Sequence, residues 1–339
     1  MNPRLSLAVC ALALALSGCA RSTLPTAVEK DGATPFAPVD RFKAFNITTN
    51  NSQPRHIALG ADGRAWFTES DLNANKIGVL DAKGKVTEFT VPTSGSQPDD
   101  MTVGADGALW FTCPSGFPDF FIGRITTAGA FTGFAPACDP LGGCSIVPLG
   151  IAAGPDGNIW FTESQRNAVV RLTPAGVFTF FTLPTAGANP NGITAGPDGA
   201  LWFTESNANQ IGRVDPVSGV VTEFAGLSSG PNRIAAGPDG ALWFTESFAS
   251  RIGRISTSGA VSEFALAAGA FPFDIVGGPD GNVWFTEHTA GQLAKITPAG
   301  VVTEVQAVRG GPWGIGRGAD GMLWITMLEG NRLGRYTLL

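Results

Sequence analysis

The chain repeats one short pattern seven times: a tryptophan, then an aromatic residue or an isoleucine, then a threonine. The tryptophans recur every 40 to 50 residues, at Trp66, Trp110, Trp160, Trp202, Trp243, Trp284 and Trp324. An Asp-Gly pair precedes each of them, as in Asp198-Gly199, and glycine readily takes the positive φ that a tight hairpin turn requires. Repetition at this period is typical of solenoids and propellers.

The copy around Trp202 shows what one unit contains. Four short segments, separated by Gly-rich or Asn-rich turns, are expected to be strands: 190–195, 200–205, 211–214 and 220–224. Four strands in each period are typical of a propeller blade and not of a helical repeat. The 45 glycines and 24 prolines agree, because they interrupt helices and punctuate short strands. The sequence therefore predicts an all-β fold, a seven-bladed β-propeller with four-stranded antiparallel blades.

The two ends of the repeat region complement each other. The last unit stops after its third strand, at 333–336, and has no fourth strand. The segment 41–47 stands before the first unit and resembles the fourth strands of the other units. We expect this N-terminal strand to complete the seventh blade, which closes the ring and leaves no open sheet edge. The propeller domain is predicted to span residues 41–339.

Residues 1–19 are predicted to be a lipoprotein-type signal peptide, because Arg4 precedes an apolar stretch too short to span a bilayer and the segment ends Leu-Ser-Gly-Cys. This ending resembles a bacterial lipobox, in which Cys19 carries the lipid; an ordinary cleaved signal peptide is the alternative. Residues 20–40, rich in Ser, Thr, Pro and Ala, are expected to form a flexible tether. We expect an exported protein whose lipid is its only membrane contact, anchored in the bacterial cell envelope (periplasm or outer membrane), or else a secreted one.

The composition limits the classes of binding partner, and the cysteines can be assigned an oxidation state. Only 15% of the residues are charged, the net charge is −6 and no basic run occurs, which argues against nucleic-acid binding. Export places the three later cysteines in an oxidising compartment. Cys138 and Cys144 bracket a turn-rich loop and are expected to pair, while Cys113 stays an alternative partner for either. We expect a monomer.

The start of each first strand and the end of each second strand share one face of the ring, which is the default ligand-binding mouth. The residue after each first-strand proline differs from blade to blade: Arg55, Asp99, Leu149, Asn191, Asn232, Phe273 and Trp313. The next residue differs too: His56, Asp100, Gly150, Gly192, Arg233, Asp274 and Gly314.

This loss of symmetry suits an asymmetric, partly apolar ligand, whether a small molecule, a peptide or a glycan, although drift of loop-proximal positions is an alternative explanation. The candidate ligand-binding residues are Arg55, Asn191, Asn232, Arg233, Phe273 and Trp313. The candidate catalytic residues are His56, Asp99 and Asp274.

This face carries two further polar features, a repeated glutamate and a histidine. Glutamate follows the threonine of the pattern in five blades, at Glu69, Glu163, Glu205, Glu246 and Glu287. A carboxylate ring suggests a metal site, but a residue repeated so often is expected to be a fold element that accepts N–H bonds from loop backbone. His288 follows the last of these glutamates and is expected to be solvated.

The combined pattern resembles a known family. The run Gly-Pro-Asp-Gly-x-x-Trp-Phe-Thr-Glu, followed by Asn-x-Ile-Gly-Arg and Val-Thr-Glu-Phe, is similar to the repeats of the virginiamycin B lyase (streptogramin B lyase) family over residues 41–339. The resemblance implies a seven-bladed propeller that linearises a cyclic depsipeptide antibiotic by elimination across its ester. That chemistry uses Mg²⁺ as a Lewis acid on the carbonyl and a base for the Cα proton.

The family's functional residues correspond to different residues here. The family's catalytic histidine corresponds to Trp313 here, and the glutamate near it corresponds to Gly311. A second histidine of the family corresponds to Phe273, and a tyrosine corresponds to Arg55. Its metal-binding glutamate falls on Glu329 if one residue is gapped, and otherwise on Leu328. Because tryptophan cannot take a proton, the resemblance implies a protein that does not run the family reaction by the family's mechanism.

Three functions follow as hypotheses. The first is an exported, diverged lyase-like propeller that binds a ligand at its mouth without streptogramin lyase activity. The second is an active Mg²⁺-dependent carbon–oxygen lyase on a cyclic depsipeptide or related ester, with a relocated base. The third is a lactonase of the gluconolactonase type, which the lack of an acidic metal-binding pattern in the sequence disfavours.

Overall fold

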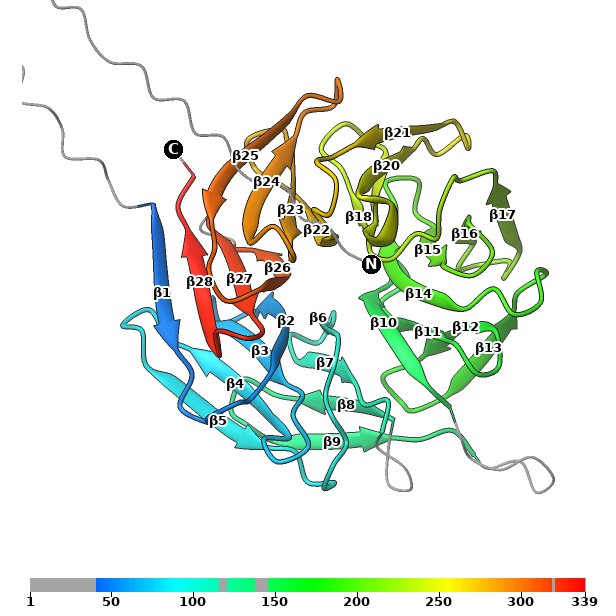
Figure 1. The fold of residues 1–339 in the computed structure, drawn as a ribbon. Coiled ribbons are helices and arrows are strands. Elements are labelled where there is room, and N and C mark those ends of the chain that lie inside the picture. Colours follow the sequence, from blue (N-terminus) through cyan, green and yellow to red (C-terminus); the bar gives the residue numbers. More distant parts are fainter. Residues whose placement is uncertain (1–40, 116–120, 138–145, 319–320, 339) are drawn as a thin grey trace, which may run out of the picture. The chain divides into compact units, whose positions relative to one another are not determined.

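The computed structural model describes residues 41–115, 121–137, 146–318 and 321–338. These residues form seven sheets of four antiparallel strands each, arranged as blades around an axis (Figure 1). The predicted seven-bladed propeller is confirmed. One short 3-10 helix, η1 (Ser247–Ala249), is the only helix of the described part, in which no helix is long and apolar enough to cross a membrane.

The strands of each blade follow in order from the axis outward. Blade 1 consists of β2 (Pro54–Leu59), β3 (Ala65–Glu69), β4 (Lys76–Leu80) and β5 (Val86–Thr90). Blade 2 consists of β6 (Met101–Val103), β7 (Leu109–Thr112), β8 (Ile122–Ile125) and β9 (Phe131–Phe134). Blade 3 consists of β10 (Pro148–Ala153), β11 (Ile159–Glu163), β12 (Ala168–Leu172) and β13 (Phe178–Thr182). Blade 4 consists of β14 (Pro190–Ala195), β15 (Leu201–Glu205), β16 (Gln210–Val214) and β17 (Val221–Ala225). Blade 5 consists of β18 (Ile234–Ala236), β19 (Leu242–Glu246), β20 (Arg251–Ile255) and β21 (Val261–Ala265). Blade 6 consists of β22 (Pro272–Gly277), β23 (Val283–Glu287), β24 (Gln292–Ile296) and β25 (Val302–Ala307). Blade 7 consists of β26 (Pro312–Arg317), β27 (Leu323–Met327), β28 (Arg332–Tyr336) and β1 (Phe42–Asn46).

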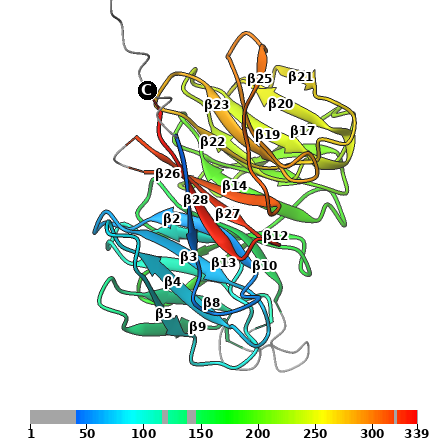
Figure 2. The ribbon, with the colours of Figure 1, turned by 60° about the vertical axis from the view of Figure 1, so that its left-hand side comes forward.

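The seventh blade combines both ends of the propeller. β1 pairs with β28 in antiparallel register, with Phe42 opposite Tyr336 and Asn46 opposite Arg332. Figure 2 shows β1, in blue, beside β28, in red. The innermost strands contact their neighbours all the way round, and β26 packs on β2 of blade 1. The expected closure by the N-terminal strand is confirmed.

The repeated tryptophan and the turn before it form one structural unit, as blade 4 shows. Trp202 is fully buried and packs on Phe244 of the next blade. Its indole N–H donates to Asp198 Oδ1 at 2.9 Å, across a turn in which Gly199 has a φ of 77°. Arg213 donates to the other carboxylate oxygen at 2.8 Å. The turn aspartate accepts the indole N–H in the first six blades, so this part of the repeat serves the fold.

The repeated threonine links each blade to the next. Thr326 Oγ1 accepts the backbone N–H of Gly314 in its own blade at 2.8 Å and donates to the carbonyl of Arg55 in blade 1 at 2.7 Å. Equivalent bonds occur at all seven blade boundaries. They hold the starts of the inner strands, where the candidate mouth residues stand.

Candidate functional site

The residues after the first-strand prolines stand at the starts of the inner strands, around the axis. On one side Arg55 Nη1 lies 3.2 Å from Asp99 Oδ1 in an ion pair. Elsewhere on the rim Asn191 Nδ2 donates to Asn232 Oδ1 at 2.8 Å. Asn232 Nδ2 in turn donates to Ser247 Oγ at 3.1 Å. The mouth therefore has a salt-bridged part and a part lined by oriented amides.

Five rings, which we call the aromatic cluster, pack on one another beside the mouth. The centroids of Phe273 and Trp313 are 3.6 Å apart. The centroid of the His288 ring lies 4.9 Å from that of Trp313, with the ring planes nearly perpendicular, and 6.1 Å from that of Phe271. Phe271 also meets Phe248 at 5.4 Å, and Phe248 is 90% exposed. Exposed aromatic area of this kind gives a ligand large apolar contacts with little conformational freedom to lose.

A hollow of about 440 Å³, which we call the Asn–Phe hollow, opens beside the aromatic cluster. Phe248, Phe271 and Phe273 line part of it. The polar side chains that line it come from blades 4 and 5 and their loops: Asn189, Asn191, Ser206, Asn207, Asn232 and Ser247. Apolar walls with a few fixed polar groups, in a hollow of this size, are typical of sites for small organic ligands.

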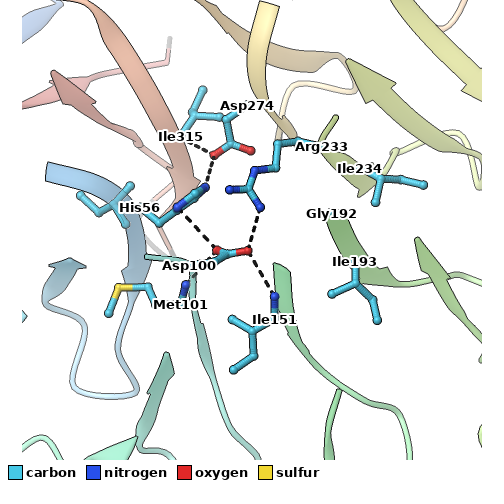
Figure 3. Close-up of a pocket in the computed structure, with 11 residues that line it drawn as sticks. His56, Asp100, Met101, Ile151, Gly192, Ile193, Arg233, Ile234, Asp274 and Ile315 are labelled. Atoms are coloured by element: carbon cyan, nitrogen blue, oxygen red, sulfur yellow. Dashed lines mark hydrogen bonds and ion pairs between the residues drawn. The ribbon is translucent and has the colours of Figure 1, made fainter. Parts of the chain in front are cut away.

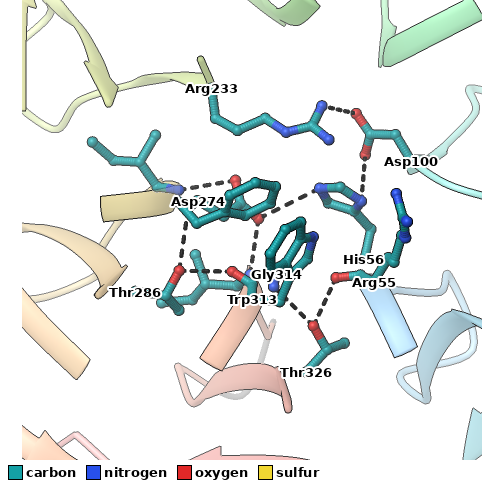
Figure 4. Close-up of polar contacts among 12 residues, drawn as sticks. Arg55, His56, Asp100, Arg233, Asp274, Thr286, Trp313, Gly314 and Thr326 are labelled. Carbon is teal, nitrogen blue, oxygen red and sulfur yellow. Dashed lines mark hydrogen bonds and ion pairs between the residues drawn. The ribbon is translucent and has the colours of Figure 1, made fainter. Parts of the chain in front are cut away.

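One residue further along the inner strands, four polar side chains meet on the axis (Figure 3). Arg233 reaches from blade 5 to blade 2, where its Nη1 lies 3.2 Å from Asp100 Oδ2. His56 stands between two aspartates, with Nδ1 3.8 Å from Asp100 Oδ1 and Nε2 3.9 Å from Asp274 Oδ2. Figure 4 shows Trp313 beside these side chains. We call His56, Asp100, Arg233 and Asp274 the axial cluster.

The predicted site residues lie in two separate places, the rim of the mouth and the axial cluster. Arg233, predicted to line the mouth, is 7% exposed and belongs to the axial cluster. His56 and Asp274, predicted as catalytic, come together there, whereas Asp99 pairs with Arg55 at the rim. The prediction did not include Asp100. Neighbouring residues on a strand point in different directions, so a shift of one position separates rim from axis.

Burial governs protonation on the axis. Burial, reinforced by Arg233, lowers the pKa of His56 to about 3, so its imidazole is neutral at neutral pH. Burial also raises the pKa of Asp274 to about 6 and raises that of Asp100, although Arg233 opposes both shifts. A base with so low a pKa is poorly matched to proton abstraction at neutral pH. His56 is therefore a weak candidate for a general base.

The loops after β23 and β27 bring together a second polar pair. His288 Nε2 lies 3.3 Å from Glu329 Oε1, and the His288 side chain is only 19% exposed, so its expected solvated position is wrong. Its Nδ1 is buried and has no hydrogen-bond partner among the described residues. Gly311 makes room for the pair, because a Cβ there would overlap Glu329 Oε2. An imidazole oriented by a carboxylate, in contact with Trp313, has the geometry of a general base.

The family resemblance implies Mg²⁺, and the residues at the corresponding positions do not fit it. Mg²⁺ requires several oxygen ligands in near-octahedral geometry. Glu329 is 59% exposed and faces an imidazole, while Gly311 and Leu328 offer no side-chain oxygen. Across the described ranges, no group of three or more His, Cys, Asp or Glu side chains is placed to share a metal ion.

The expectation that the repeated glutamates accept loop N–H bonds is correct for Glu163 but wrong as a general rule, because buried carboxylate oxygens have no hydrogen-bond partner among the described residues in Glu69, Glu205, Glu246 and Glu287. Glu163 accepts N–H bonds from loop backbone, among them that of Val147 at 2.7 Å, as expected. In four other blades the glutamate interacts with a second glutamate on the outer strand: Glu69 with Glu88, Glu205 with Glu223, Glu246 with Glu263 and Glu287 with Glu304. Burial, and then the second carboxylate, raise the pKa of the first member of each pair. It reaches about 8 in Glu69 and Glu205, and about 7 in Glu246 and Glu287.

The cysteines divide between described and undescribed residues. Cys113 is buried in blade 2 and has no disulfide partner among the described residues, and burial raises its pKa. Cys19, Cys138 and Cys144 lie outside the described residues, so the lipid anchor and the disulfide stay predictions.

Comparisons with known proteins agree with the repeat pattern. The family model described as Virginiamycin B lyase family matches residues 22–227 and 148–339. The virginiamycin B lyase of Nocardia farcinica is 35% identical over 140 residues, which cover 41% of this chain and 44% of that protein. The virginiamycin B lyase of Bordetella bronchiseptica is 41% identical over 51 residues, which cover 15% of this chain and 17% of that protein. The matched segments span less than half of either relative.

Solved structures extend the similarity over the propeller. A streptogramin B lyase structure is 36% identical with a TM-score of 0.78, covering 88% of this chain and 97% of that chain. A catalytically inactive variant of virginiamycin B lyase from Staphylococcus aureus, solved with quinupristin, is 36% identical with a TM-score of 0.79, covering 88% and 99%. Hydrazine synthase of Kuenenia stuttgartiensis is 15% identical with a TM-score of 0.69, covering 91% and 99%, and shares the fold alone.

Proposed function

The chain belongs to the virginiamycin B lyase family, and from this membership we propose that it binds an apolar, aromatic-bearing small molecule or peptide at its mouth without opening streptogramin B antibiotics. The residue at the family's catalytic position carries the proposal. The family resemblance assigns this position to Trp313, which packs on Phe273 at 3.6 Å, and neither ring can take a proton from a substrate. We propose that the protein works in the cell envelope, held by a lipid on Cys19.

The aromatic cluster and the Asn–Phe hollow support binding at this place. Phe248 and Phe271 offer stacking surface, while the amide of Asn191 is held in one orientation by Asn232. An exposed apolar side chain beside fixed amides favours a ligand with both rings and peptide groups. A depsipeptide such as quinupristin has this character and is a suitable first probe, since it was solved with the related S. aureus protein.

The binding test is calorimetric titration of quinupristin into the wild-type protein and two variants. Phe248→Ala removes one exposed ring from the hollow and should weaken binding about threefold to tenfold, the range expected of a single aromatic contact. Val217→Ala is the matched control, because Val217 is 93% exposed and lies outside the hollow. Equal affinities of the two variants, or no binding to the wild type, would contradict the proposal.

One observation favours a second candidate, a carbon–oxygen lyase with a relocated base. His288 lies 3.3 Å from Glu329 and contacts Trp313, the residue that the family resemblance assigns to the catalytic position. A histidine oriented by a carboxylate can take the Cα proton of a bound ester while the C–O bond to the carboxylate leaving group breaks.

Chromatography with mass detection distinguishes the two candidates and the lactonase alternative. Elimination opens the ring without a change of mass, whereas hydrolysis adds the mass of one water. An isomer formed by the wild type and lost in His288→Gln would establish the second candidate. Unchanged antibiotic from both proteins supports binding alone.

A further inference from the structure

The axial cluster has no part in the proposed function, although it is a built polar site. It lines a cavity of about 130 Å³ on the propeller axis, together with Gly192, Met101 and a set of isoleucines (Figure 3). A water molecule takes up about 30 Å³ of liquid, so a space of this size admits only a few non-hydrogen atoms.

The hydrogen-bond polarity around His56 defines what the cavity can bind. Its Nδ1 lies 3.2 Å from the backbone carbonyl of Asp99, which can only accept, so the ring proton is on Nδ1. Its Nε2 therefore presents a lone pair. That atom is buried, has no hydrogen-bond partner among the described residues, and faces Asp274 Oδ2 at 3.9 Å. Two acceptors thus face each other across a gap that suits a donor.

The charges of the axial cluster also favour a ligand that donates hydrogen bonds and carries a positive charge. Asp100 is neutralised by Arg233, and at the rim Asp99 is neutralised by Arg55. Asp274 accepts only backbone N–H bonds, from Ile275 at 2.9 Å and Ile315 at 2.9 Å. Arg233 also favours the ionised form of Asp274, but its single positive charge faces two carboxylates, so with His56 neutral the axial cluster carries one net negative charge at neutral pH. A buried charge of this kind is stabilised by a bound cation.

We infer that the axial cluster is a binding site for a primary ammonium group, which donates hydrogen bonds to His56 Nε2 and Asp274 Oδ2. A primary ammonium carries one positive charge and three donors on a compact head, which matches the two acceptors and the cavity. A quaternary ammonium has no N–H, and a metal monocation prefers oxygen ligands to an imidazole nitrogen. The ammonium belongs either to a free small cation or to the end of a longer ligand. A longer ligand would extend into the mouth, because Asp274 directly follows Phe273 of the mouth.

Thermal unfolding of the wild-type protein tests the inference, with methylammonium chloride titrated at constant ionic strength against sodium and tetramethylammonium chlorides. We expect a saturable rise in Tm with methylammonium alone. Phenylethylamine distinguishes the two sources, since tighter binding than methylammonium identifies a ligand that extends into the mouth, and equal binding identifies a free cation. Equal shifts with all three salts, or none with methylammonium, would overturn the inference.

Two charge-matched variants locate the site. Asp274→Asn should weaken methylammonium binding about tenfold or more, the usual effect of losing a charged hydrogen-bond partner. Asp215→Asn makes the same charge change in an outer turn, where Asp215 accepts from Val217 and Ser218, and should bind as the wild type does. Equal affinities of the two variants place the cation elsewhere and refute the assignment.

Imidazole nitrogen resonances give a readout that does not depend on any variant folding. The chain has only two histidines, so the signals are few. Methylammonium should shift the Nε2 resonance of His56 saturably and leave those of His288 in place. A shift of His288 alone would refute the site.

Discussion

At every blade boundary a threonine hydroxyl stands between two backbones, accepting an N–H from its own blade and donating to a carbonyl of the next. Thr326 makes these bonds where blade 7 meets blade 1. Thr326→Val leaves both backbone groups without their partner in a buried place and should lower the free energy of unfolding by about 1–3 kcal/mol.

Thr326→Ser is the control, since it keeps the hydroxyl and loses only a methyl group. It should retain most of the stability in urea unfolding monitored by tryptophan fluorescence. If the valine variant is as stable as the serine variant, the hydroxyl bridge does not hold the ring closed.

Residue positions are also where prediction from sequence was weakest. The sequence predicts Arg233 among the ligand-binding residues of the mouth, but it lies on the axis, and it predicts a solvated His288, which instead contacts Glu329. Neither contact has a signal within the repeat. The first depends on side-chain direction along one strand, and the second depends on how two loops of different blades meet after Gly311 removes a side chain.

At the scale of the blade, the paired glutamates behave as one element. Blades 2 and 7 have Cys113 and Met327 in place of the first glutamate. These two blades also lack the second glutamate, since Gly133 and Ala44 stand at its position in the strand register. In the blades that have both, such as Glu205 with Glu223, burial and then the second carboxylate raise the pKa of the first glutamate. The sequence shows both glutamates, the second within the Val-Thr-Glu-Phe run, but not that they meet, because only strand pairing brings them together.

These pairs make stability depend on pH. The pKa of Glu205 is about 8 and that of Glu287 about 7 in the folded protein, against 4.5 for the ordinary group. Between these values the unfolded chain binds fewer protons than the folded one, so the free energy of unfolding falls as pH rises from about 5 to about 8. Below this window both states are protonated and the loss is absent.

Glu205→Gln imitates the protonated carboxyl and should reduce this loss by about 1–2 kcal/mol, since one unit of pKa corresponds to about 1.4 kcal/mol. The measurement is urea unfolding of both proteins at pH 5 and pH 8. A variant that loses as much stability as the wild type would contradict the pairing.

At the scale of the whole molecule, the fold was predictable because seven copies of one unit admit few arrangements, and the strand missing at one end matches the spare strand at the other. β1 covers the edge of β28 and the face of Trp324, whose ring stacks on Phe45 at 6.0 Å. A chain that begins after Ile47 should therefore show a lower Tm and self-associate through the uncovered edge.

The control is a chain that begins at residue 41 and keeps β1. Size-exclusion chromatography and thermal unfolding compare the two. Identical Tm values and elution volumes would show that the N-terminal strand does not close the ring in solution.

The central claim is that a family propeller keeps a binding mouth while Trp313 replaces the proton-accepting group. The direct measurement is the chromatogram of quinupristin after prolonged incubation with the wild-type protein and Mg²⁺. We predict that the antibiotic is recovered with its ring intact and that the protein retains it in equilibrium dialysis. A linear isomer of unchanged mass, formed in proportion to protein concentration, would contradict the claim.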